Sequence, residues 1–241
     1  QNTVPGRVTS FFAKKSARVF STFEATADYF KKDVAQKLVP AGNPMRKKIL
    51  APADREAARR HFNLKHCKRA VLAIGGSQGA LRINELMLGL KKSFPREFQE
   101  IGIIWSTGDL SFQKYKDAVH ESADAGSVYM SPFIEEVTLA YRASDLAISR
   151  AGSGVMVEIA AMGLPSVLIP FPFAALDHQD KNADVFAKAG VSIKIANGDA
   201  TPEKAGPQIL ELLNNPSRLA RMGARALEVA KPNAAAAVSY T

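Results

Sequence analysis

The chain has 241 residues, 46% hydrophobic and 23% charged, which is typical of a globular protein rather than a disordered one. Its single cysteine, Cys67, excludes an internal disulfide framework and fits a reducing compartment, and no apolar run is long enough to predict a membrane-spanning helix. The net charge of +9 is spread over short basic pairs without base-stacking aromatics between them, so we expect no nucleic-acid partner and favour an anionic membrane surface or a phosphorylated substrate.

The start of the chain predicts small elements only. A short amphipathic helix begins near Thr9, and a strand and a further helical turn or two follow it. Because elements this small cannot bury a core of their own, we expect residues 1–40 to be the tail end of a preceding domain. A Gly-Asn-Pro stretch within residues 41–46 marks a linker, and we expect residues 41–241 to form the main domain.

Strands and helices alternate about six times from Arg69 onward, which predicts a doubly wound, mostly parallel α/β sheet of the Rossmann-like kind with helices on both faces. The expected strands cover residues 69–74, 101–106, 127–130, 146–149, 166–170 and 191–195. The expected helices cover residues 52–62, 81–91, 112–122, 135–144, 155–162, 182–189, 201–213 and 218–230.

Two of the turns between a strand and a helix are rich in small residues. They are GGSQGA at Gly75–Ala80 and RAGSG at Arg150–Gly154. Glycine lets a ligand approach the backbone closely, and the free N–H groups of a first helical turn suit a phosphate. The first turn is neither a G-x-G-x-x-G fingerprint nor a P-loop. In a parallel sheet both turns lie at the carboxyl edge, where α/β sheets bind ligands, so we expect both to face one ligand.

Polar side chains follow the second turn at helical spacing. Glu158 lies about one and a half turns into the helix, where a carboxylate can accept two hydrogen bonds from a ribose diol. The later stretch DHQDKN places His178, Gln179 and Asn182 near one helix start, and amides both donate to and accept from sugar hydroxyls. Each residue alone is more often a solvated or capping residue, so the hypothesis rests on the combination.

That combination, R-x-G-x5-E followed by HQDKN, resembles the donor-sugar half of the MurG family of bacterial GT-B glycosyltransferases. GNP-x-R at residues 42–46 and GGSQGA also match, and the resemblance covers nearly the whole chain. It implies a C-terminal, donor-binding GT-B domain. The substrate-binding residues that it implies are Asn2, Arg46, Ser77, Ile134 through its backbone, Ser153, Gly154, Val155, Met156, Val157, Glu158, His178, Gln179 and Asn182.

The resemblance also implies a reaction, the inverting transfer of N-acetylglucosamine from UDP-N-acetylglucosamine to a lipid-linked muramyl-pentapeptide in peptidoglycan synthesis. It implies peripheral attachment to the cytoplasmic side of the plasma membrane and neither a metal nor another cofactor. The general base of the family belongs to a Gly-rich loop that we expect upstream of Gln1, so we expect this chain alone to bind donor weakly and not to turn over.

Three other interpretations stay open on the residues alone. A related GT-B glycolipid glycosyltransferase would use the DHQDKN stretch to recognise another sugar. A dinucleotide-dependent oxidoreductase is disfavoured because the G-x-G-x-x-G fingerprint is missing. A non-catalytic module for anionic partners is suggested only by the charge of +9.

Overall fold

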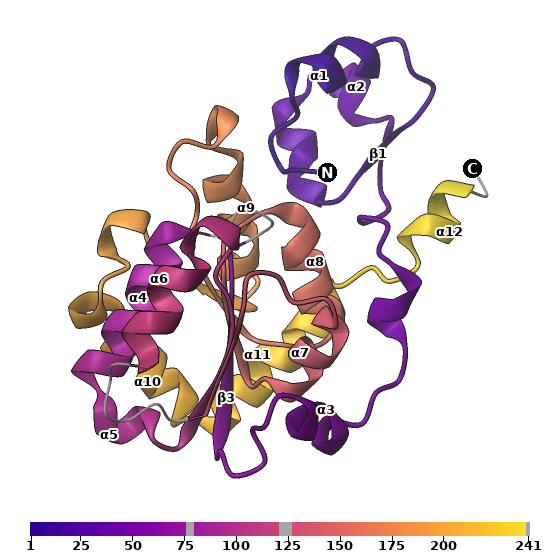
Figure 1. The fold of residues 1–241 in the computed structure, drawn as a ribbon. Helices are drawn as coiled ribbons and strands as arrows, with labels where there is room; N and C mark the ends of the chain where they lie inside the picture. Colours follow the sequence, from indigo (N-terminus) through magenta and orange to yellow (C-terminus); the bar gives the residue numbers. More distant parts are fainter. Residues whose placement is uncertain (76–79, 121–126, 240–241) are drawn as a thin grey trace.

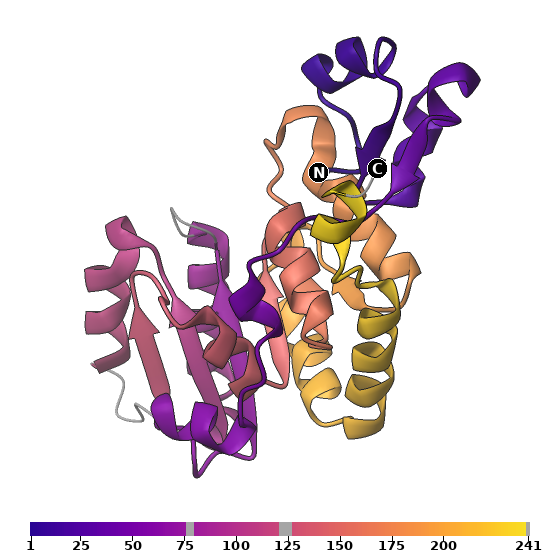
Figure 2. The same ribbon diagram turned by 90° about the vertical axis from the view of Figure 1, so that its right-hand side faces the viewer.

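The computed structural model describes residues 1–75, 80–120 and 127–239. Within them, parallel strands form one sheet in the order β5-β4-β3-β6-β7-β8 (Figures 1 and 2). The strands are β3 (Arg69–Ile74), β4 (Ile101–Ser106), β5 (Val128–Ser131), β6 (Leu146–Ser149), β7 (Ser166–Leu168) and β8 (Ser192–Lys194). The chain winds outward from β3 in one direction and from β6 in the other, so the topological switch point lies between these two strands. The predicted doubly wound α/β fold is confirmed.

Helices cover both faces of this sheet because successive strand residues point to opposite faces. Along β3, Val71 and Ala73 join a core with α4, whereas Ala70 and Leu72 join a second core with α3 and α7. Figure 1 shows the two layers on either side of β3. The helices of these layers are α3 (Arg55–His61), α4 (Leu81–Ser93), α5 (Pro95–Phe98), α6 (Asp109–His120), α7 (Val137–Ala143), α8 (Ser153–Ala161), α9 (His178–Lys188), α10 (Pro202–Leu213) and α11 (Pro216–Val229).

Most boundaries fall close to the predicted ones, and two elements differ for local reasons. The helix expected over residues 52–62 begins only at Arg55, because the carboxylate of Asp54 accepts hydrogen bonds from the N–H groups of Glu56 and Ala57 and so caps the first turn. The short helix α5 was not expected. Pro95 at its first position fixes a helical φ in a stretch too short to show a period.

The first part of the chain forms a small layer above the sheet (Figure 1). It contains α1 (Arg7–Ala13), β1 (Val19–Ser21), a 3-10 turn at Glu24–Tyr29, α2 (Lys32–Ala35) and β2 (Leu38–Pro40). The sequence did not predict β2, which pairs in parallel with β1. Lys231, which precedes α12 (Ala234–Ser239), donates from Nζ to Glu24 Oε1 at 3.2 Å and to the Pro40 carbonyl at 3.0 Å. These bonds tie the layer to the end of the chain.

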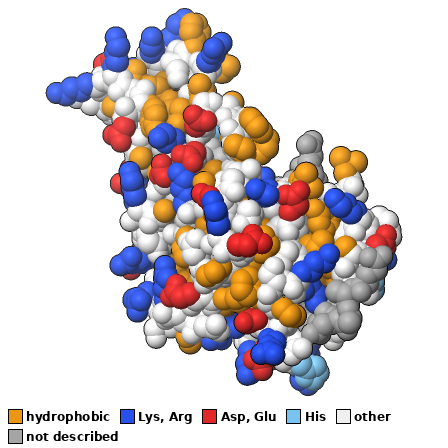
Figure 3. All heavy atoms as spheres, turned by 90° about the vertical axis from the view of Figure 1, so that its left-hand side faces the viewer, with side chains coloured by type: hydrophobic (Ala, Val, Ile, Leu, Met, Phe, Trp, Pro, Cys, Tyr) orange, Lys and Arg blue, Asp and Glu red, His pale blue; other side chains and the backbone are white. Residues whose placement is uncertain are grey.

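The surface carries charges of both signs. On the face drawn in Figure 3, the coloured Lys and Arg side chains are interspersed with Asp and Glu rather than gathered into one stripe.

The predicted helix α1 is present, but its apolar residues Val8, Phe11 and Phe12 are exposed, and the basic Lys14 and Lys15 follow them. No described helix combines the length and apolar character needed to cross a bilayer.

Candidate functional site

The turn from β6 into α8 lies at the carboxyl edge of the sheet, as the sequence predicts, and beside the switch point. Gly152 precedes the helix with an extended backbone and caps it without a side-chain hydrogen bond. Within the described structure, a Cβ added at Gly152 or Gly154 would have no atom within 4 Å, so their own packing does not require glycine there. The space beside the two glycines instead lets a ligand approach the helix N-terminus closely. The positive end of the helix dipole favours an anion there.

Glu158 sits in the second turn of α8 at the centre of a hydrogen-bonded group. Its side chain is 15% exposed, and Oε1 and Oε2 accept from Arg46 Nη2 at 3.2 and 3.4 Å. Oε2 also accepts from the Tyr141 hydroxyl at 3.0 Å. Two carboxylate oxygens offer about four acceptor positions. The carboxylate is therefore oriented by two partners while still able to accept hydrogen bonds from a ligand diol.

Tyr141 is a residue that the sequence reasoning missed. It is buried on α7, and burial first, followed by the negative charge of Glu158, raises its pKa well above the ordinary value, while Arg46 opposes this shift. The hydroxyl therefore keeps its proton and remains a donor to the carboxylate. The apolar spacing of α7 gave the only signal, since a Tyr on a buried helix face needs a partner for its hydroxyl.

Arg150, the first residue of the R-x-G-x5-E motif, braces the loop that follows β7. Its Nη1 donates to the carbonyls of Ile169 and Pro170 at 3.1 and 3.2 Å and to Asn197 Oδ1 at 2.7 Å. Its guanidinium lies 5.5 Å from the ring centre of Phe171, within the range of a cation–π contact. Burial, and then the charge of Arg82, lowers the pKa of Arg150. Arg150 thus shapes the loop rather than pointing toward a ligand.

Gln179 and His178 begin α9 at the end of the same loop. Gln179 Oε1 accepts from the Phe171 N–H at 3.0 Å, and His178 Nδ1 lies 2.7 Å from the Ala175 carbonyl. Leu176 and Asp177, just before them, adopt left-handed backbone angles with φ of 54° and 51°. Because such angles cost energy in residues other than glycine, the backbone before α9 is locally strained and is held by the surrounding hydrogen bonds.

Asn182 is fully buried one turn further along α9, and its amide joins the two parts of the chain. Its Oδ1 accepts from the Thr3 N–H at 2.9 Å and from the Thr3 hydroxyl at 3.0 Å. Its Nδ2 donates at 3.1 Å to Asn2 Oδ1 and at 3.1 Å to the Ala151 carbonyl. Asn2 and Asn182, both expected near the ligand, are thus brought together beside the α8 turn, with the amide of Asn182 committed within the protein.

The other expected site residues fall into three groups. Ser153 and Met156 are buried in α8, and Val155 and Val157 are partly buried there, while Gly154 is exposed. Ile134 follows β5, so its backbone lies at the carboxyl edge of the sheet. Its side chain is buried, whereas the ring of the neighbouring Phe133 is exposed. Ser77 lies outside the described residues.

Residues 76–79 of the GGSQGA turn lie outside the described residues, and a buried network fixes α4, the helix that follows them. Asn84 in α4 donates from Nδ2 to the Thr107 carbonyl at 2.9 Å, and its Oδ1 accepts from Trp105 Nε1 at 2.8 Å. This network holds the first turns of α4 against the carboxyl end of β4. Across residues 1–75, 80–120 and 127–239, no group of three His, Cys, Asp or Glu side chains could hold a metal ion.

Comparison with known proteins gives the family. Residues 70–238 match the glycosyltransferase family 28 C-terminal domain. The UDP-N-acetylglucosamine--N-acetylmuramyl-(pentapeptide) pyrophosphoryl-undecaprenol N-acetylglucosamine transferase of Aquifex aeolicus is 35% identical over 90% of this chain and 60% of its own length. The protein of that name from Halothermothrix orenii is 33% identical over 96% of this chain and 63% of its own length. The chain therefore spans about three fifths of these relatives.

Solved structures agree on the fold. The crystal structure of MurG from Acinetobacter baumannii superimposes with a TM-score of 0.75 at 24% identity, covering 98% of this chain and 64% of that one. The range that matches the family, residues 70–238, begins one residue into β3 and ends within α12, so it contains the other five strands of the sheet, the α8 turn and Glu158. By this match the chain belongs to glycosyltransferase family 28 and carries its C-terminal domain.

Proposed function

We propose that this chain is the donor-binding part of a glycosyltransferase that uses UDP-N-acetylglucosamine. The observation that carries the proposal is the pairing of an open helix N-terminus at Gly152–Gly154 with a carboxylate, Glu158, that is already oriented by Arg46 and Tyr141. A nucleotide sugar needs both an anion site for its diphosphate and an acceptor for its ribose hydroxyls.

The roles follow from the positions of the groups. The first N–H groups of α8, around Ser153 to Val155, hold the diphosphate, and the exposed guanidinium of Arg46 adds positive charge near the nucleotide. Glu158 accepts from the ribose diol, and the backbone of Ile134 pairs with the uracil edge. Ser77, Met156 and Val157 complete the lining that the family resemblance implies.

The sugar lies under the loop held by Arg150. Gln179 exchanges its bond with the Phe171 N–H for sugar hydroxyls, and His178 adds a ring nitrogen from the same helix turn. Asn182 acts with Asn2 at the junction with residues 1–40, which we propose to be the tail end of a separate, acceptor-side domain, with residues 41–241 as the donor-side domain. Rearrangement of that junction would release the Asn182 amide from Thr3 and Asn2 and bring both amides toward the sugar.

The reaction that we propose for the whole protein is an inverting displacement. An acceptor hydroxyl forms a bond to the anomeric carbon while the bond from that carbon to the UDP oxygen breaks, and the hydroxyl proton passes to a general base. The positive end of α8 and Arg46 stabilise the charge that develops on departing UDP, without a metal. The relatives named above act on a pyrophosphoryl-undecaprenol acceptor, and we propose the same lipid-linked muramyl-pentapeptide here.

A lipid-linked acceptor places the protein at a membrane, and we propose peripheral attachment at the cytoplasmic side. The exposed apolar residues of α1, Val8, Phe11 and Phe12, followed by Lys14 and Lys15, are of the kind that insert into an anionic interface.

Calorimetric binding of UDP-N-acetylglucosamine tests the proposal, with UDP-N-acetylgalactosamine and NADH as competing ligands. Loss of two charge-assisted hydrogen bonds in Glu158→Ala should weaken binding about 100-fold. Glu100→Ala is the matched control, because it removes the same charge at the other end of the sheet, where Glu100 pairs with Lys68.

Each outcome separates the alternatives. Equal binding by the Glu158→Ala variant and the parent chain would remove the assigned role of the carboxylate. Preference for another UDP-sugar would indicate a related glycolipid glycosyltransferase, and preference for NADH an oxidoreductase. Binding that ignores the sugar and collapses with salt would indicate an anion-binding module.

A further inference from the structure

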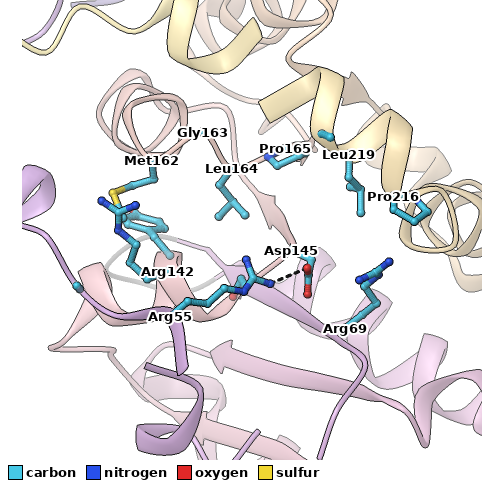
Figure 4. A pocket seen from close by; sticks show the side chains of 14 residues that line it. Arg55, Arg69, Arg142, Asp145, Met162, Gly163, Leu164, Pro165, Pro216 and Leu219 are labelled. Carbon is cyan, nitrogen blue, oxygen red and sulfur yellow. Dashed lines mark hydrogen bonds and ion pairs between the residues drawn. The ribbon is translucent and has the colours of Figure 1, made fainter. Parts of the chain in front are cut away.

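A cavity lies at the amino edge of the sheet, the edge opposite to the α8 turn. It has a volume of about 350 Å³, within the range of small-ligand sites. Three arginines, Arg55, Arg69 and Arg142, line it together with a single carboxylate, Asp145 (Figure 4). Apolar side chains of Met162, Leu164, Pro165 and Leu219 form another part of the lining. The cavity therefore combines an excess of positive charge with an apolar wall.

The carboxylate is already satisfied by the protein. Asp145 Oδ1 accepts from Arg55 Nη2 at 2.7 Å, and Oδ2 accepts from Arg59 Nη2 at 2.9 Å and from the Ala70 N–H at 2.8 Å. Arg59 also donates to the carbonyls of Cys67 and Ala143, so its role is structural. The single negative charge of Asp145 is shared between Arg55 and Arg59, so it cannot also neutralise Arg69 and Arg142.

The two remaining arginines, Arg69 and Arg142, have N–H donors that a ligand can use. Arg69 uses Nε to donate to the Leu213 carbonyl at 3.1 Å, which fixes the side chain and leaves its terminal nitrogens at the cavity. Arg142 Nε is buried without a hydrogen-bond partner among the described residues. A buried donor of this kind is costly unless something accepts from it. Figure 4 shows Arg142 and Arg69 on opposite sides of the Arg55–Asp145 pair.

The backbone adds to the positive field. The N-terminus of α11, a 14-residue helix, faces the cavity through Pro216, Leu219 and Ala220. Pro216 has no N–H and the Arg218 N–H donates to Asn215 Oδ1, so the helix contributes the positive end of its dipole to the cavity rather than a free N–H group from these residues.

We propose that this cavity binds a phosphate anion attached to a small apolar group. The guanidinium of Arg142 holds the phosphate, because Arg presents paired donors that match phosphate oxygens, and the charges of Arg55 and Arg69 and the dipole of α11 add to the positive field around it. The apolar group packs on Met162, Leu164 and Leu219. Tyr141 also lines the cavity, and its hydroxyl holds Glu158 at 3.0 Å, so an occupant would touch a residue of the donor site.

The test uses the full chain, with UDP present to occupy the donor site, and butyl phosphate as the probe in a calorimetric titration. Arg142→Gln should weaken binding about ten-fold, because it removes one charged donor group. Arg96→Gln, on the exposed surface of α5, removes the same charge elsewhere and should bind as the parent does. Ala220→Glu places a carboxylate at the mouth without disturbing the core and should abolish binding.

Phosphatidylglycerol vesicles distinguish a lipid headgroup from a soluble phosphate. Vesicle binding that falls in Arg142→Gln but not in Arg96→Gln assigns the cavity to a headgroup. Butyl phosphate binding that falls in Arg142→Gln, with vesicle binding equal in both variants, assigns it to a soluble ligand. If Arg142→Gln and Ala220→Glu match Arg96→Gln for both probes, the proposal is wrong.

Discussion

Two carboxylates, Asp145 and Glu158, lie at opposite ends of the same sheet and differ in what their partners leave free. Their side chains are almost equally buried, at 12% and 15% exposed, and each pairs with arginine. Asp145 accepts from Arg59, itself only 12% exposed, and from the backbone of β3. Glu158 accepts from Arg46, which is 61% exposed and lies in extended backbone just before the 3-10 turn at Lys47–Leu50.

The comparison teaches that the exposure of the partners, rather than of the carboxylate, separates a structural ion pair from a binding group. Asp145 joins α3, β3 and β6 through the buried guanidinium of Arg59 and the Ala70 N–H, and the half-exposed Arg55 adds one further donor. Glu158 is held by one buried hydroxyl and one solvated guanidinium that can move toward a ligand. A buried charge whose partner cannot be hydrated is costly to strand, whereas a solvated partner is not.

The largest expected effect is on stability at Asp145. Asp145→Asn strands the buried guanidinium of Arg59 and should lower the free energy of unfolding by about 3 kcal/mol. Glu158→Gln is the matched change and should lower the free energy of unfolding by less than about 1 kcal/mol, because the exposed guanidinium of Arg46 stays hydrated. Urea unfolding of both variants measures the difference. Equal losses would mean that the two carboxylates play the same structural role.

The next effect concerns Tyr141, whose hydroxyl links the two helices around Glu158. Tyr141→Phe removes one hydrogen bond to the carboxylate, worth about 1 kcal/mol, and should weaken UDP-N-acetylglucosamine binding about five-fold. The fold should persist, since the ring stays in place. Calorimetry measures the affinity, and an unchanged affinity would show that Arg46 alone orients Glu158.

The pH dependence of stability gives an independent readout for the same variant. Burial and the charge of Glu158 raise the pKa of Tyr141 well above its ordinary value. The folded state then holds the proton more tightly than the unfolded chain, so this contribution is complete below about pH 10 and is lost as the pH rises further. The parent chain should lose more stability than Tyr141→Phe between about pH 9 and about pH 11. The pKa of Tyr115 is also raised, but that residue is present in both proteins.

The sequence predicts the sheet and the α8 turn because both depend on local patterns. Alternating apolar runs and small-residue turns indicate β6 and α8, and the spacing places Glu158 in the second turn. Tyr141 could not be assigned in this way, because it meets Glu158 through the packing of α7 against α8, a contact that no periodicity encodes.

Asn182 shows the same limit over a longer distance. Its spacing from Gln179 predicts a shared polar face, but the structure buries it against Thr3, 179 residues away. The strand β2 was missed because three residues paired with β1 carry too short a pattern to detect. In each case a contact distant in sequence decides what a locally ordinary residue does.

The smallest expected effect on stability has the opposite sign. Gly154→Ala adds a methyl group where no described atom lies within 4 Å, and alanine is the better helix former. The free energy of unfolding should therefore rise by about 0.5 kcal/mol. If the diphosphate approaches the α8 turn, the same methyl should weaken UDP-N-acetylglucosamine binding about ten-fold, as a steric clash in an otherwise intact site.

Gly223→Ala is the control, because its Cβ would lie 2.6 Å from the carbonyl oxygen of Gly163, in a packed contact between α11 and the end of α8. That variant should lose stability without touching the turn. A stabilised Gly154→Ala variant that binds donor as tightly as the parent chain would show that the glycine is not kept for the ligand. A stabilised variant that binds weakly would separate the two demands at one position: the fold accepts a side chain there, and the ligand excludes it.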